Sequence, residues 1–292
     1  MSRSPAPRAR VRDGLLLLTA AAGTSVLWHR LRTGVVPGGR ARWARTNHAG
    51  DEVTLLEGVA LVAGATGTAV LAGPVAGLGA ARTTAMLVTG VGAGWVGAVD
   101  DLRQDTDRKG LAGHLGALAR GHVTTGSLKI LVLAGTGLVG AALVDHAAAS
   151  GRGRTRGALG TLVGGAVVAG AANLANLFDL RPGRALKVGL LSATPLVATG
   201  PGAPGAAVVA GTAAALLPDD LAGRSMLGDT GANPLGALVG LAVVDRWQGR
   251  GRLLALALIT GLTLASEKVS FTAVIESTPG LRELDALGRP RR

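Results

Sequence analysis

The chain has 292 residues, no Cys, 48% hydrophobic residues and a mean hydropathy of +0.40, which favours a multi-span helical membrane protein over a soluble domain. The net charge of +12 does not indicate nucleic acid as a partner, because Lys and Arg form short clusters between apolar runs and only 2% of residues are aromatic. The absence of Cys excludes disulfides and thiolate metal sites.

Apolar segments follow one another along the whole chain. They predict an all-α bundle of about nine transmembrane helices, forming a single integral membrane domain over 1–292. Several segments are shorter than the about 20 residues that a span usually needs, so 185–217 can also be read as one kinked helix. The first segment can be read as a secretory signal, but the later segments favour a first membrane helix. The segments lie near 14–31, 53–80, 83–99, 128–146, 158–178, 185–200, 203–217, 230–244 and 252–272.

The Lys and Arg residues predict which side of the membrane the polar segments face. With nine spans, alternate connections share a face, and one face carries 19 Lys and Arg while the other carries 11. The more basic face is predicted to be cytoplasmic, although the four Arg before the first helix favour the opposite orientation. We therefore expect a multi-pass protein of the cell (plasma) membrane. The segments on the more basic face are 30–52, 100–127, 179–187, 218–229 and 273–292.

The first acidic stretch, "GAVDDLRQDTDRKG" (97–110), places Asp100 and Asp101 at the end of an apolar segment. Adjacent carboxylates at a membrane helix end are costly unless something binds them. Mg²⁺ together with a phosphate is a suitable partner, because this ion takes one or two carboxylates and keeps several waters. A solvated helix end is the alternative interpretation.

The second stretch, "NLANLFDLRPGR" (173–184), begins in the last turns of an apolar helix. Asn173 and Asn176 are spaced i and i+3 and share one helix face, which Asp179 continues. This face is expected to point inward, because amides facing lipid would lack partners. Hydrogen bonding between helices is the alternative interpretation.

The third stretch, "RSMLGDTGANPLG" (224–236), contains a Gly-Asp-Thr-Gly turn that leads into the next helix. Small residues let the backbone approach a ligand, and the amides at a helix N-terminus favour an anion. Asp229 can then hold a metal or act as a base; an ordinary turn with an Asp N-cap is the alternative.

The final stretch, 268–292, carries apolar residues at helical spacing between basic ends, and it predicts an amphipathic tail at the membrane interface. The apolar residues are Phe271, Val274, Ile275, Leu281, Leu284 and Leu287.

These motifs, in this order over roughly residues 40–275, resemble the polyprenyl-phosphate N-acetylhexosamine-1-phosphate transferases. This superfamily includes the phospho-MurNAc-pentapeptide translocases and the bacterial GlcNAc-1-phosphate transferases. The resemblance rests on Asp100-Asp101 followed by Lys-Gly-Leu at 109–111, on Asn-x-x-Asn-x-x-Asp at 173–179 and on Gly-Asp-x-Gly at 228–231.

The resemblance implies transfer of a sugar 1-phosphate from a UDP-amino sugar to a polyprenyl phosphate, with release of UMP, for cell-envelope glycan synthesis. It also implies a helical membrane bundle with membrane lipids around it, a cytoplasmic site, Mg²⁺ (or Mn²⁺) as cofactor, and it allows a homodimer. The implied catalytic residues are Asp100, Asp101 and Asp229, and the implied metal ligands are Asp101, Asp179 and Asp229. The implied substrate-binding residues are Lys109, Asn173, Asn176, Arg181, Arg184 and Lys187.

The chain departs from the family pattern at two positions of the second stretch. The family usually has a second Asp where this sequence has Pro182, and Leu180 replaces a Gly. A non-catalytic relative that binds polyprenyl phosphate or a nucleotide sugar, as a regulator or assembly partner, is therefore an alternative function. A small transporter with broken helices is a third.

Overall fold

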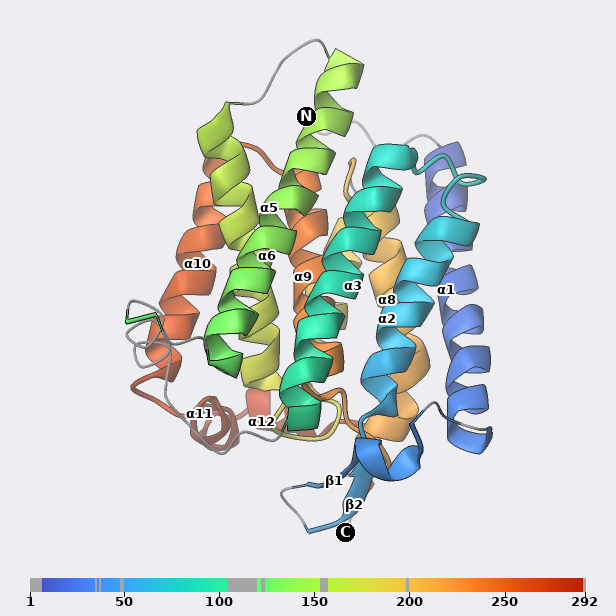
Figure 1. Cartoon of the computed structure of the whole chain (residues 1–292), viewed down its shortest axis with the longest axis vertical. Helices are drawn as coiled ribbons and strands as arrows, with labels where there is room; N and C mark the ends of the chain where they lie inside the picture. The colour runs from blue at the N-terminus through green and yellow to red at the C-terminus, as the bar shows by residue number, and fades with distance from the viewer. Residues whose placement is uncertain are drawn as a thin grey trace.

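The computed structural model describes residues 7–34, 36, 38–47, 50–103, 120–121, 124–152, 157–197 and 200–290. These residues form eleven α-helices and one short β-hairpin (Figure 1), so the prediction of an all-α protein is confirmed. Nine helices have 14 residues or more: α1 (Pro7–Thr33), α2 (Leu56–Leu71), α3 (Ala80–Arg103), α5 (Thr125–Arg152), α6 (Ala158–Phe178), α7 (Arg184–Val197), α8 (Ala203–Leu221), α9 (Gly228–Arg246) and α10 (Arg250–Ser266).

Each of the nine predicted apolar segments overlaps one of these nine helices. The alternative of one kinked helix over 185–217 is wrong, because α7 ends at Val197 and α8 begins at Ala203. The predicted C-terminal tail holds the two remaining helices, α11 (Phe271–Ser277) and α12 (Leu281–Ala286). The hairpin consists of β1 (Ala44–Thr46) and β2 (Glu52–Thr54), which pair in antiparallel fashion after a 3-10 turn at Arg40–Trp43.

Fewer helices than nine meet a strict test for crossing a membrane. Among the described residues, α5 (over Thr125–Ser150) and α6 are long and apolar enough, and α10 with α11 forms a third stretch if this pair, bent by 93°, is one broken span. Helices α2 and α7 have only 16 and 14 residues, less than the about 20 of a usual span. A membrane location is thus supported by two or three helices, and nine spans remain a prediction.

Helix α9 lies in the middle of the bundle and is buried along almost its whole length. It packs against α6 and α3 most extensively and also contacts α2, α5, α7 and α8. Small residues make these approaches possible: a methyl group on Gly236 would lie 2.1 Å from the carbonyl oxygen of Ala171 in α6. The same holds between α3 and α9, where a methyl group on Gly97 would lie 2.1 Å from the carbonyl oxygen of Asp229. The glycines therefore fix how closely α9 meets its neighbours.

Successive long helices alternate in direction, so alternate connections gather at one end of the bundle (Figure 1). This end, called the site end below, contains the hairpin, the ends of α3 and α6, the start of α9, and helices α11 and α12. The arrangement brings the three acidic stretches of the sequence to the same end of the molecule.

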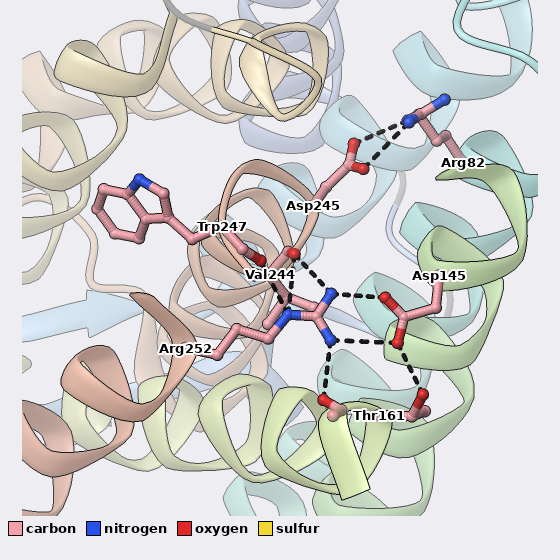
Figure 2. A network of polar contacts seen from close by, with 8 residues as sticks. Arg82, Asp145, Thr161, Val244, Asp245, Trp247 and Arg252 are labelled. Carbon is pink, nitrogen blue, oxygen red and sulfur yellow. Dashed lines mark hydrogen bonds and ion pairs between the residues drawn. The ribbon is translucent and has the colours of Figure 1, made fainter. Parts of the chain in front are cut away.

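The opposite end is held by a buried ionic network (Figure 2). The Arg252 guanidinium, only 2% exposed, donates to both oxygens of Asp145 at 2.6 and 3.1 Å and to the carbonyl oxygens of Val244, Trp247 and Gly160. Thr161 also donates to Asp145, at 2.7 Å. This network ties the start of α10 to α5, α6 and α9. A second pair, Arg82 with Asp245, joins α3 to α9 at 2.7 Å.

Candidate functional site

The carboxylate of Asp101, at the end of α3, caps the N-terminus of α9. It accepts hydrogen bonds from the backbone N–H groups of Asp229 (3.2 Å) and Thr230 (2.8 Å) and from the Thr230 hydroxyl (2.6 Å). Gly228 has a φ of 58° and leaves no room for a side chain, since a Cβ there would lie 2.8 Å from an Asp101 oxygen. The sequence Gly-Asp-Thr-Gly thus forms a helix start that is shaped around a carboxylate from another helix.

Lys129, in the first turns of α5, joins Asp100 and Asp229. Its ammonium forms an ion pair with Asp229 and lies 3.8 Å from the carboxylate of Asp100. Burial, together with a hydrogen bond and repulsion from Asp229, raises the pKa of Asp100 to about 7. Three carboxylates and one ammonium from three helices therefore form one cluster, which we call the acidic cluster (Asp100, Asp101, Lys129, Asp229).

Sequence reasoning placed the three Asp residues of this cluster among its candidates but missed Lys129. The residue lies just inside a predicted apolar segment, where a lone ammonium is unfavourable unless it has a partner. That mismatch between residue type and segment is the signal that points to it.

Asp179 lies at the C-terminus of α6, beside the acidic cluster. Burial, followed by repulsion from Asp220, Asp229 and Asp101, raises the pKa of Asp179 well above its usual value. Asp220, in the last turn of α8, is 2% exposed, and burial raises its pKa to about 7. Its Oδ2 has no hydrogen-bond partner among the described residues. Sequence reasoning missed Asp220, because a lone Asp-Asp pair at 219–220 resembles any solvated helix end.

A polar cavity of about 710 Å³ opens at the site end, next to Asp179 and Asp220. The hairpin closes one side, because the backbone N–H of Met226 donates to the carbonyl of Thr54 at 3.1 Å. The second acidic stretch, the segment before α9 and the C-terminal segment form the other walls. The lining residues are Thr46, Asn47, Val53, Asp179–Pro182, Asp220–Gly223, Ser225, Met226, Glu276, Arg289 and Pro290.

The predicted substrate-binding cations contact the C-terminal segment. Arg184 donates to both oxygens of Asp285, at 2.8 and 3.0 Å, and to the Thr272 hydroxyl at 2.8 Å. Lys187 donates to the carbonyl oxygens of Leu284 (3.1 Å) and Asp285 (2.6 Å). Arg181 forms an exposed ion pair with Glu276 at 3.0 Å and also lines the polar cavity. Of these three cations, Arg181 alone reaches a cavity wall, and substrate binding by the other two remains a prediction.

The predicted amides, Asn173 and Asn176, line neither the polar cavity nor the apolar cavity described below. Asn173 and Asn176 are half-buried on α6, whereas Leu174 and Phe178 on another face of this helix line a second cavity. The remaining candidate, Lys109, lies outside the described residues, as does the whole Lys-Gly-Leu stretch at 109–111.

The second cavity is apolar, has a volume of about 730 Å³, and lies between α6, α7, α9 and α10. It follows these helices from Phe178 at the site end to Arg246 and Trp247 at the opposite end. Helix α10 borders it, packs mainly against α6 and makes few contacts with α9. Arg252 ties one end of α10 to the bundle, and α11 follows the other end, where the rings of Phe178 and Phe271 stack 4.9 Å apart.

The predicted metal ligands Asp101, Asp179 and Asp229 come from three helix ends that meet. Within the part of the chain that the structure describes, no three His, Asp or Glu side chains form a group with the geometry of a metal site. The oxygens of Asp101 are engaged by the start of α9, which explains why this residue does not join such a group.

No protein-family model matches the sequence, and no curated protein matches it either. The family resemblance therefore rests on the motifs alone.

Proposed function

We propose that this protein is an integral membrane enzyme that transfers a sugar 1-phosphate from a UDP-amino sugar to a polyprenyl phosphate. The observation that carries the proposal is the acidic cluster, in which Asp100 and Asp101 from one motif meet Asp229 from another, with Lys129 between Asp100 and Asp229. Motifs that lie about 130 residues apart thus meet at one end of the bundle. The ordered motif set that resembles the family supports the same reading.

The reaction joins two anionic groups, so the site has to reduce their repulsion. A phosphate oxygen of the polyprenyl phosphate forms a bond to the sugar-bearing phosphorus while the bond from that phosphorus to UMP breaks. The Lys129 ammonium is placed to neutralise charge on the transferred phosphate, an interaction that gains strength in a site shielded from water. Asp100, with a pKa near 7, is suited to take up a proton from the lipid phosphate, whose own second pKa is about 6.

The residues fit a divalent cation in one arrangement. Mg²⁺ commonly uses one or two carboxylates together with substrate phosphates, and the partly exposed carboxylate of Asp229, which pairs with Lys129, would be one ligand of the ion. When bound, Mg²⁺ would neutralise negative charge on the pyrophosphate. Mn²⁺ would suit the same oxygen ligands, and Asp179, which lines the polar cavity, would be a second carboxylate available to such an ion.

The two cavities fit the two substrates. The polar cavity beside Asp179 has the size and the mixed lining of a small-molecule site, and it suits the nucleotide. The apolar cavity along α6, α7, α9 and α10 suits a prenyl chain lying at the depth of the bilayer. Both lie next to the helix ends that carry the acidic residues.

The test is release of UMP by the purified full chain in detergent or nanodiscs, with Mg²⁺, a panel of UDP-amino sugars and a polyprenyl phosphate. We expect turnover that falls about 100-fold or more in Lys129→Gln and Asp229→Asn, because each variant removes a group that stabilises transferred charge. Lys268→Gln is the matched control, since Lys268 is exposed and lies just beyond α10. Absence of UMP release with every sugar nucleotide would reject the proposal.

One observation favours the alternative of a non-catalytic binder. Pro182 stands where the family has a second Asp, and its carbonyl is engaged by Arg289 at 2.8 Å. A binder would retain affinity for UDP-sugar or polyprenyl phosphate and release no UMP. The affinity of a binder for both ligands would also be unchanged by Asp100→Asn. This result distinguishes a binder from an enzyme whose substrate has not been identified.

A further inference from the structure

The C-terminal segment, residues 271–290, supplies one wall of the polar cavity through Glu276, Arg289 and Pro290. No residue of this segment is fully buried. It is held on the bundle mainly by polar contacts to the start of α7 and to the loop after α6. The wall therefore owes its position to a few charged side chains.

Three cations gather where this segment meets α7. The Asp285 carboxylate receives Arg184 at 2.8 Å and Arg289 at 2.9 Å, and Lys187 donates to the backbone carbonyl of the same residue at 2.6 Å. Three cations thus surround the Asp285 carboxylate at the edge of the cavity. Two of them, Arg289 and Lys187, also act on Asp220, whose pKa burial raises to about 7.

We propose that the C-terminal segment completes an anion-binding site in the polar cavity, in which Arg289 binds a phosphate group of the ligand and Asp285 positions Arg289. The proposal deepens the proposed function and rests on it only for the identity of the ligand as a uridine nucleotide.

Arg289 is the cation of this group that is placed to bind a ligand. It lines the cavity, its Nε donates to the Pro182 carbonyl at 2.8 Å, and its Nη2 pairs with Asp285. The Nη2 atom is buried and, although it lies 2.9 Å from Asp285, makes no hydrogen bond to the described residues, so the guanidinium retains donor capacity for a ligand. A planar donor of this kind matches phosphate oxygens.

Arg184 and Lys187 are positioning residues in this arrangement. The Arg184 side chain is 3% exposed and uses Nε, Nη1 and Nη2 on Asp285 and Thr272. Lys187 is directed at backbone carbonyls of α12. Both hold the segment that carries Arg289, so the chain places a cation beside Pro182, where the family pattern has a carboxylate.

The experiment measures binding of three probes, UDP, uridine and inorganic pyrophosphate, to the full chain in nanodiscs by calorimetry. In Arg289→Gln, the Kd for UDP and for pyrophosphate should rise about 10-fold or more, because a charged hydrogen bond to the ligand is lost. The Kd for uridine should not change, since uridine carries no phosphate. Arg289→Lys should recover part of the affinity for UDP.

Arg282→Gln is the matched control, because Arg282 is an exposed Arg of α12 that pairs with Glu283. It should change each Kd less than twofold. Asp285→Asn should weaken UDP binding less than Arg289→Gln does, and thermal unfolding shows whether this variant is folded.

The outcomes separate the two proposals. Equal Kd values of UDP and pyrophosphate for the wild type and Arg289→Gln overturn the anion site, and so does a parallel loss of uridine binding, which indicates a collapsed cavity. If pyrophosphate binding depends on Arg289 but the wild type binds neither UDP nor uridine, the anion site stands and the proposed function fails.

Discussion

The carboxylate of Asp101 accepts hydrogen bonds from the backbone N–H and the hydroxyl of Thr230, at 2.8 and 2.6 Å, across 129 residues of sequence. The end of α3 and the start of α9 are thereby one structural unit. Lys129 adds α5 to this unit through Asp229. The spacing of the three helices at this point sets the geometry of the acidic cluster.

Enlarging Gly97 should disrupt this unit. In Gly97→Ala the new methyl group would lie 2.1 Å from the Asp229 carbonyl oxygen, so α3 and α9 have to separate. We expect a loss of about 1–3 kcal/mol in the free energy of unfolding and a loss of activity. Gly135→Ala is the control, because a Cβ there meets nothing within 4 Å, and it should leave stability unchanged or slightly raised. Equal effects of the two variants would mean that the helices do not pack this closely.

Removal of the Lys129 charge should destabilise the protein more at pH 8 than at pH 5.5. Lys129 lowers the pKa of Asp100, which burial and Asp229 raise to about 7. Without the ammonium this pKa rises further, and the charged form of Asp100 becomes less favourable beside Asp229. The unfolding temperature of Lys129→Gln should therefore fall further below wild type at pH 8 than at pH 5.5. A difference independent of pH would show that Asp100 and Lys129 are not coupled.

Asp219 and Asp220 are neighbours with opposite pKa shifts, and their Asn variants should have opposite effects. Burial raises the pKa of Asp220 to about 7 from 3.8, so its stabilising neutral form is lost as the pH rises from about 4 to 7. The difference between these two pKa values corresponds to a loss of at most about 4 kcal/mol in the free energy of unfolding at pH 8. Asp220→Asn should thus raise the unfolding temperature at pH 8 and have little effect at pH 4.

Asp219 provides the contrasting case. Partial burial raises its pKa, but hydrogen bonds from Trp28 and Arg224 and the charge of Arg32 outweigh this and hold the pKa below its usual value. The stabilisation is present above the unfolded pKa of about 3.9 and is lost as the pH falls through the lower folded value. Asp219→Asn should therefore lower the unfolding temperature at pH 8. If both variants shift it in the same direction, burial does not distinguish the two carboxylates.

Breaking the buried pair at the opposite end should be more harmful than removing it. Arg252→Met leaves the Asp145 carboxylate buried without its main partner, at a cost of about 3–5 kcal/mol in the free energy of unfolding. The double variant Arg252→Met with Asp145→Leu should recover most of this loss. A double-mutant cycle measured by chemical unfolding provides the coupling energy, and additive effects would contradict the contact.

The sequence predicted the helices well because they depend on apolar runs and their polar ends. All nine predicted segments overlap a helix, and the acidic stretches lie together at one end of the bundle. The contact between Asp101 and the start of α9 also agrees with the sequence pattern, since a Gly-Asp-Thr-Gly turn indicates a helix start that favours an anion.

The contacts of the cations could not be predicted in this way. Arg184 and Lys187 follow an acidic helix end and were expected to face a substrate, but their partners lie about 100 residues later, in α12. Local spacing contains no information about such a contact. Asp220 was missed for a similar reason, because its burial depends on how α8 packs and not on its neighbours in sequence.

The attachment of α12 to α7 also determines when the polar cavity forms during synthesis. Asp285 is translated 101 residues after Arg184, which at the usual rate corresponds to a delay of about 5–20 s. Throughout this interval the nascent bundle contains Arg184 without its carboxylate, and the cavity lacks the wall that holds Arg289. A ribosome that stalls before Asp285 would therefore leave a helical bundle whose polar cavity lacks one wall.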